Sequence, residues 1–261
     1  MKFKKLTKKN YYQTNNGWLT NSKINDWLKD KCYFYRKNIL GTVPPKKTDA
    51  MLIGSAVDEW LTKGRKSFDK KYKLVSRRTS GNDYELNQTQ YDHIVKMCEK
   101  IEIQDAYKSL KKHKKQVILS YPLELGRHFA GIAGMPDFLK INGNHANIVD
   151  LKTSAEMDSI NKYHWHCENF GYYRQAAMYS LLVYLNYPEI TDIICNHLVV
   201  EKDSDGIYNV FTYILSDDRI KFEINKILNT LPEVAHETKF AARNASWFDA
   251  VTIGGMEKYE S

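Results

Sequence analysis

Two acidic residues and a lysine in the middle of the chain have the types and the spacing needed to act on a phosphate. Asp137 follows Pro136, and Asp150, Leu151 and Lys152 follow one another further along. Carboxylate oxygens are the ligands that Mg²⁺ and Mn²⁺ prefer. An ammonium group beside such a cation can orient or deprotonate a water molecule for attack on a phosphate. The simpler interpretation is an exposed Asp–Lys pair, which stabilises a protein by less than about 1 kcal/mol.

The strands predicted around these residues determine where the side chains point. Asn142-Gly143 is a strong hairpin signal between two strand-like stretches. A two-residue loop there places Asp137 opposite Ile148, whereas a four-residue loop places it opposite Asp150. Either loop puts both carboxylates on one face of the sheet, within roughly 8 Å of each other, and the lysine shares that face. Because neighbouring carboxylates repel each other, this geometry favours a bound cation over the exposed pair.

The same residues resemble the signature of a known family. Pro136-Asp137 followed by Asp150-Leu151-Lys152 resembles the PD-(D/E)XK nuclease superfamily, and Gln175 and Tyr179 on the next helix resemble the Q-x-x-x-Y element of its RecB-like branch. The likeness is greatest to RecE-type phage and prophage exonucleases. It implies a restriction-endonuclease-like α/β fold, in which a mixed central sheet is flanked by helices and elaborated by N-terminal helices. The catalytic residues that it implies are Asp137, Asp150, Lys152, Gln175 and Tyr179.

The resemblance also implies where a cation binds. The stretch from Gly54 to Glu59 is similar to the family's G-x-x-x-H helix, with Asp58 where many relatives carry His. Asp58 is therefore the expected ligand in this helix, with Glu59 as the fallback, and Glu124 is a weaker site candidate. The implied ligands of Mg²⁺, for which Mn²⁺ can substitute, are Asp58, Asp137, Asp150 and the carbonyl of Leu151. Cysteine spacing does not match the iron–sulfur members of the family.

Hydrophobic periodicity predicts an α-α-α-β-β-β-α-β-β-α order in a single domain. Its parts are a mainly helical segment over 1–115, a catalytic core over 116–237 and a C-terminal tail over 238–261. The stretch 66–80 is predicted to be a basic, exposed connection. The predicted helices cover about 22–41, 49–63, 87–111, 169–186 and 217–237, and the predicted strands cover 116–125, 128–141, 146–153, 191–201 and 208–215.

Composition limits the class of protein. The 261 residues carry 39 Lys and Arg against 31 Asp and Glu, a formal charge of +8, and 43% are hydrophobic. This excludes a disordered chain, and no apolar run is long enough to span a membrane, so a cytoplasmic protein is expected. Basic clusters at 2–9, 63–78 and 108–115 favour a polyanionic partner, because phosphate contacts release counterions.

These observations predict a Mg²⁺-dependent deoxyribonuclease. The RecE-type resemblance implies an exonuclease that resects double-stranded DNA ends from 5′ to 3′ for recombination. It also implies a homo-oligomeric ring and a single-strand annealing protein as partner. Two alternatives remain open: an endonuclease that acts in repair or defence, and a nucleic-acid-binding protein on a catalytically silent nuclease fold.

Overall fold

A five-stranded sheet runs through the middle of the computed structural model, which describes residues 5–13, 16–44, 48–77, 79, 82, 84–155, 160–202 and 206–241. The strands lie in the order β3–β6–β7–β8–β9. Strands β7 and β8 are parallel and the other neighbours are antiparallel, which confirms the expected mixed sheet. The bounds are β3 Lys114–Lys115, β6 Phe138–Asn142, β7 His145–Ala155, β8 Asp192–Lys202 and β9 Tyr208–Ile214.

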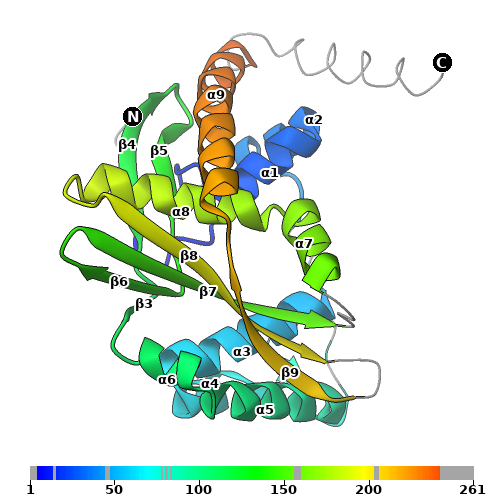
Figure 1. Cartoon of the computed structure of the whole chain (residues 1–261). Coiled ribbons are helices and arrows are strands. Elements are labelled where there is room, and N and C mark those ends of the chain that lie inside the picture. Colours follow the sequence, from blue (N-terminus) through cyan, green and yellow to red (C-terminus); the bar gives the residue numbers. More distant parts are fainter. Residues whose placement is uncertain are drawn as a thin grey trace.

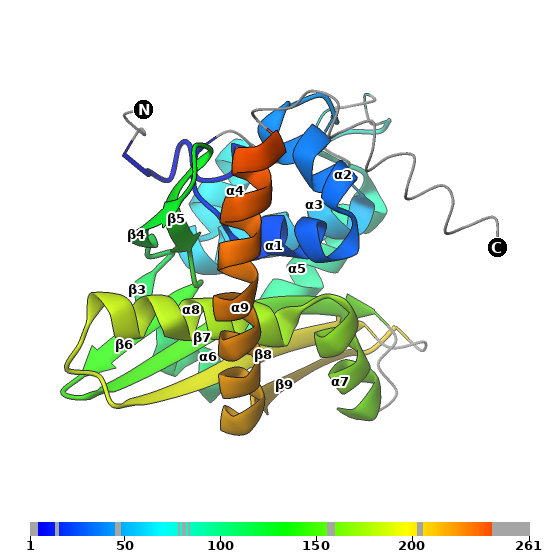
Figure 2. The same cartoon turned by 90° about the horizontal axis from the view of Figure 1, so that it is seen from above.

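Helices cover both faces of this sheet (Figure 1). One face is covered by α8, and α9 crosses over α8 (Figure 2). The other face is covered chiefly by α3 and α5, with α4 and α6 beside them. The bounds are α3 Asp49–Lys63, α4 Arg65–Lys71, α5 Gln88–Glu102, α6 Asp105–Leu110, α8 Tyr172–Asn186 and α9 Asp217–Ala241. The described region also contains the short parallel pair β1 Lys73–Leu74 and β2 Glu85–Leu86.

Alternation along β7 divides the core into two apolar layers. Ala146 and Ile148 lie in the cluster that includes the buried residues of α8. Val149 and, less deeply, Leu151 lie in the cluster formed by α3 and α5. Successive strand residues point to opposite faces, and each buried aliphatic side chain contributes roughly 1.5–3 kcal/mol. The register of β7 is therefore strongly specified, as is the face to which Asp150 points.

The chain just before the first helix pairs with a second, smaller sheet. Strands β4 (Leu119–Leu125) and β5 (Phe129–Gly134) form a hairpin that contacts α8. Leu19 forms a parallel bridge with Ile132, and its N–H donates to the carbonyl of Gly131 at 2.9 Å. This pairing places the start of α1 (Asn21–Lys29) beside β5. The chain then continues through α2 (Lys31–Phe34) and a π-helical turn, η1 (Tyr35–Ile39).

The predicted single strand 128–141 is wrong. It is two strands, β5 and β6, which belong to different sheets and are separated by the residues from Met135 to Asp137. Pro136 has no N–H for a ladder hydrogen bond, so the strand ends there. The hairpin loop is also shifted by one residue, because Asn142 pairs with His145 and the loop residues are Gly143-Asn144.

Other element boundaries differ for local reasons. The predicted helix 87–111 is interrupted between α5 and α6, and Asn87 begins α5 with a capping box to Gln90. The stretch 66–80 is not simply an exposed connection, because Phe68 on α4 is buried and its ring packs 5.2 Å from that of Trp60. The predicted helix from Ser22 breaks at Asp30, whose side chain accepts a hydrogen bond from the N–H of Tyr33 in α2.

The two last predicted helices also differ from the structure. The helix predicted to start at residue 169 instead begins after Gly171, which has a left-handed φ of 69° and follows a separate helix, α7 (Ile160–Asn169). Helix α9 continues to Ala241, beyond the predicted boundary of the tail, and the rest of that tail lies outside the described residues. In the described part of the chain, no helix is both long and apolar enough to cross a membrane.

Strand β5 packs so closely against α8 that Gly134 leaves no room for a side chain. A Cβ built on Gly134 would lie 2.7 Å from Cδ1 of Tyr179 and 2.9 Å from Cδ1 of Leu182. Gly134→Ala should therefore displace α8 and lower the free energy of unfolding by about 1–3 kcal/mol. Urea denaturation, monitored by circular dichroism, measures the difference in the free energy of unfolding. An unchanged midpoint would contradict the close packing.

Candidate active site

The open edge of β7 brings the acidic residues and the lysine together. The pairing of β6 with β7 ends at Phe138 opposite Val149, so Asp137 stands where it would face Asp150. The Oδ2 atom of Asp137 accepts a hydrogen bond of 2.8 Å from the N–H of Leu151. The Asp137 carboxylate thus takes the place that the next residue of a neighbouring strand would occupy. This is the pairing that a four-residue loop predicted, although the structure reaches it with a two-residue loop shifted by one residue.

Lys152 is held by partners on two sides. Its Nζ atom forms an ion pair with Asp150 and donates a hydrogen bond of 2.8 Å to Oε1 of Gln175. Nζ also lies 4.3 Å from the ring centroid of Tyr172, within the range of a cation–π interaction. Only 11% of the Lys152 side chain and 8% of the Asp150 side chain are exposed. The ammonium group therefore has a defined position.

Gln175 and Tyr179 connect that ammonium group to the backbone next to Asp137. The two residues are one turn apart on α8, and Nε2 of Gln175 donates to the hydroxyl of Tyr179 at 2.9 Å. The hydroxyl in turn donates to the carbonyl of Met135 at 3.3 Å. This chain of hydrogen bonds links β7 to the segment that carries Asp137. The structure thus brings Gln175 close to the acidic pair, with Tyr179 behind it.

Asp58 reaches the same place from the opposite layer. Helix α3 approaches β7 closely at Gly54, where a Cβ would lie 3.3 Å from Oγ1 of Thr153. Asp58 follows one turn later on the same side of the helix. Its Oδ2 atom accepts a hydrogen bond of 2.8 Å from Gln116, whereas Oδ1 is buried and has no hydrogen-bond partner among the described residues.

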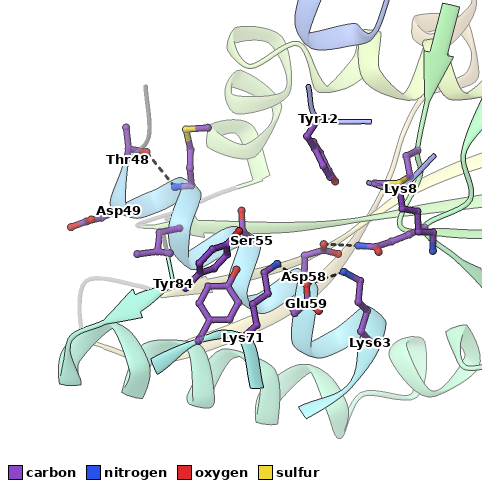
Figure 3. Close-up of a pocket in the computed structure, with 15 residues that line it drawn as sticks. Lys8, Tyr12, Thr48, Asp49, Ser55, Asp58, Glu59, Lys63, Lys71 and Tyr84 are labelled. Atoms are coloured by element: carbon purple, nitrogen blue, oxygen red, sulfur yellow. Dashed lines mark hydrogen bonds and ion pairs between the residues drawn. The ribbon is translucent and has the colours of Figure 1, made fainter. Parts of the chain in front are cut away.

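Glu59, the fallback ligand, is instead enclosed by cationic and hydroxyl groups. Its carboxylate forms ion pairs of 2.9 Å with Lys63 and 2.8 Å with Lys71 (Figure 3). It also accepts a hydrogen bond of 2.6 Å from Ser67. Burial, the largest influence, would raise the pKa of Glu59, but the hydrogen bonds from these three groups outweigh it and lower the pKa to about 2. Glu59 therefore ties α3 to α4, and Asp58 is the better candidate ligand.

Burial and neighbouring charges raise the pKa values of Asp137 and Asp58. Burial, followed by the charges of Asp150 and Asp58, raises the pKa of Asp137 well above its usual value. Burial and then the charge of Asp150 raise the pKa of Asp58 to about 6. Burial would lower the pKa of Lys152, but the charge of Asp150 outweighs it and the pKa is raised. Three acids against one ammonium group leave excess negative charge in a chain that is otherwise basic.

This donor set fits a hard divalent cation. In the described part of the chain, no three Asp, Glu, His or Cys side chains already form a compact cation cage. The unpartnered Oδ1 of Asp58 and the adjoining carboxylates of Asp137 and Asp150 nevertheless supply the oxygen atoms that Mg²⁺ and Mn²⁺ prefer. The role of the Leu151 carbonyl as a ligand stays a prediction.

Two adjoining cavities open at this site. The larger, of about 610 Å³, is lined by Asp58, Asp137, Asp150, Lys152 and Gln175 among others, and also by Leu151 and Tyr179. The smaller, of about 370 Å³, also reaches Asp58 and is lined by Lys8, Lys63 and Lys71 (Figure 3). Glu124 lies exposed on β4 and lines neither cavity.

Two residues of the larger cavity carry no signal in the sequence. Tyr11 comes from the first segment of the chain, and burial followed by the charges of Asp150 and Asp137 raises its pKa. Lys23 is buried and donates to Oδ1 of Asn16 at 2.9 Å, and burial lowers its pKa to about 7. A lysine on a short amphipathic helix ordinarily faces solvent, so only the tertiary structure identifies it.

Comparisons with known proteins identify the family and the fold. The model of a family described as a PDDEXK-like domain of unknown function matches residues 22–243. A crystal structure titled "putative exonuclease", from Eubacterium rectale, superposes with a TM-score of 0.70 at 19% identity, covering 90% of this chain and 88% of that one. The structure of SSO0001, with a TM-score of 0.28, 13% identity and coverage of 76% and 83%, carries no argument. No curated protein matches the sequence. The expected PD-(D/E)XK nuclease-like fold is thus confirmed.

The neighbouring residues Asp58 and Glu59 provide a matched pair of variants. Asp58→Asn should weaken Mn²⁺ binding at least about tenfold, because it removes a charge from the donor set. Glu59→Gln should leave Mn²⁺ binding unchanged but lower the free energy of unfolding by about 2 kcal/mol, because Lys63 and Lys71 lose their counter-ion. Isothermal titration calorimetry and thermal denaturation measure the two effects. Weaker Mn²⁺ binding in Glu59→Gln alone would reverse the assignment.

Proposed function

Because the chain belongs to the family of PDDEXK-like domains, we propose that it is a Mg²⁺-dependent deoxyribonuclease that resects the ends of double-stranded DNA from 5′ to 3′ during recombination. One observation carries this proposal. Asp137, Asp150 and Lys152 meet at the open edge of β7, where Gln175 holds the lysine. The homo-oligomer and the annealing partner stay predictions from the family resemblance.

The distribution of basic residues supports a phosphate-rich substrate. Lys8 comes from the first basic cluster and Lys63 and Lys71 come from the second, and all three line the smaller cavity beside Asp58. Lys8 also donates to the carbonyl of Lys115 at 3.4 Å, which brings the third basic cluster to the same side. Cationic groups that gather from distant segments attract a polyanion irrespective of its base sequence.

Each residue of the site has a role that its contacts allow. A divalent cation bound by Asp58, Asp137 and Asp150 would polarise the phosphate and lower the pKa of a bound water. An ammonium group has three N–H donors, and Lys152 directs two of them to Asp150 and Gln175. The third would hold the attacking water or a phosphate oxygen. Gln175 and Tyr179 keep Lys152 in place.

The arrangement argues against a silent binding protein. Placing carboxylates of like charge side by side in a partly buried site costs several kcal/mol unless they are compensated. A fold used only to bind nucleic acid gains nothing from this cost, because carboxylates repel phosphates. The cost is explained if the carboxylates serve a cation that takes part in hydrolysis.

Substitutions of the central residues test the catalytic proposal. Lys152→Ala should lower Mg²⁺-dependent hydrolysis of linear duplex DNA by about 10²- to 10⁴-fold while leaving DNA affinity unchanged, because the carboxylates and the cation that they bind remain. Asp150→Asn should abolish hydrolysis and also weaken Mn²⁺ binding. Lys140, exposed on β6, provides the control, and Lys140→Ala should retain full activity. Full activity in Lys152→Ala would refute the mechanism.

The form of the DNA tests whether the enzyme needs an end. Linear duplex carrying a 5′ or a 3′ label should be digested with Mg²⁺ and left intact with EDTA, and the 5′ label should be released first. Closed circular DNA should survive the same incubation. Cutting of circles would instead identify an endonuclease. Binding without any digestion would identify a silent fold.

A further inference from the structure

Four aromatic rings form a continuous series that starts at Lys152 and leads away from it. Tyr172 lies beneath the ammonium group, and its ring centroid is 5.6 Å from that of Phe170. Phe170 is 5.3 Å from the ring of His166, which is 5.6 Å from the ring of Trp165. These four residues, called here the aromatic track, belong to α7, to the turn that follows it and to the start of α8.

The track is open to solvent at one end and to the active site at the other. Trp165 is 58% exposed and Phe170 is 52% exposed, although large aromatic side chains ordinarily bury most of their surface. Phe170 and Tyr172 line the same cavity as Asp137 and Asp150. A chain bound in that cavity therefore meets the track as it leaves.

Contacts within the protein fix the orientation of the rings. His166 and Phe170 are one turn apart, and the His166 ring is linked to Oγ of Ser154 on β7 at 3.2 Å. The carbonyl of Phe170 accepts a hydrogen bond of 3.4 Å from Asn25 on α1. Glu168, which lies between His166 and Phe170 in the sequence, is paired with Arg219. The rings of the track therefore have fixed orientations, and Arg219 compensates the negative charge of Glu168.

We infer that the aromatic track stacks the unpaired bases of the DNA strand whose phosphate lies at Lys152. This inference rests on the proposed function and adds to it that the substrate strand is single-stranded on the side of α7. Flat aromatic rings in a series bind successive bases through their faces, whatever the base sequence. The smaller cavity, on the Asp58 side, offers lysines instead, which suit the phosphate backbone. The two sides of the active site therefore differ in chemistry.

Binding of two oligonucleotides in EDTA, where no hydrolysis occurs, tests the inference. The probes are a ten-nucleotide oligothymidylate and an abasic strand of the same length, each labelled with a fluorophore for anisotropy. Trp165→Ala should weaken binding of the oligothymidylate about tenfold and leave binding of the abasic strand unchanged. Trp165→Phe should retain most of the affinity, because a ring remains. Tyr184→Ala removes an exposed ring of α8 that lies outside the cavity and should change neither affinity.

The outcomes separate this inference from the proposed function. An equal loss for both strands would show that Trp165 acts through charge or structure, and no loss would show that its ring serves the protein alone; either result overturns the inference. Hydrolysis of linear duplex by the wild-type protein is measured in parallel with Mg²⁺. Absence of hydrolysis together with base-dependent binding would overturn the nuclease proposal and leave the track standing.

Discussion

Mutual repulsion among three carboxylates is the constraint on which the rest of the site depends. Asp58, Asp137 and Asp150 come from different elements, and Lys152 is the ammonium group that faces them most directly. Each carboxylate is held by a neighbour of fixed position: a glutamine amide, a backbone N–H or the lysine itself. Leu151 and Lys152 belong to β7, Gln116 directly follows β3, and Asp58 comes from α3, so the site forms only where α3 packs against this part of the sheet.

Helix α8 shows how the fold serves this constraint. Its buried residues complete one apolar layer, and its polar pair, Gln175 and Tyr179, points to the open edge of β7. Arg174 on the same helix donates to Asn25 and faces Glu223 at 3.8 Å, which ties α8 to α1 and to α9. A small movement of α8 would therefore move the lysine as well. The same helix thus completes the apolar core and positions Lys152.

Patterns within one or two neighbouring elements were readable from the sequence. Alternation along β7 places Asp150 and Lys152 on one face of the sheet. Helical spacing places Gln175 and Tyr179 on one face of α8. Both placements follow from periodicity alone. The choice between Asp58 and Glu59 did not, because it depends on lysines that α4 brings to α3. The division of 128–141 into two strands was equally hidden, since its apolar residues continue across Pro136 and only the sheet partners differ.

The pairing of Leu19 with Ile132 has a consequence for the order of folding. Tyr11 and Lys23 line the larger cavity of the candidate site, yet they are synthesised long before the strand that pairs with Leu19. Contacts between residues so distant along the chain form slowly, because a long loop must close first. During translation the first segment emerges without its partner. The cavity is therefore completed late, and a nascent chain that ends before β5 has no means of assembling it.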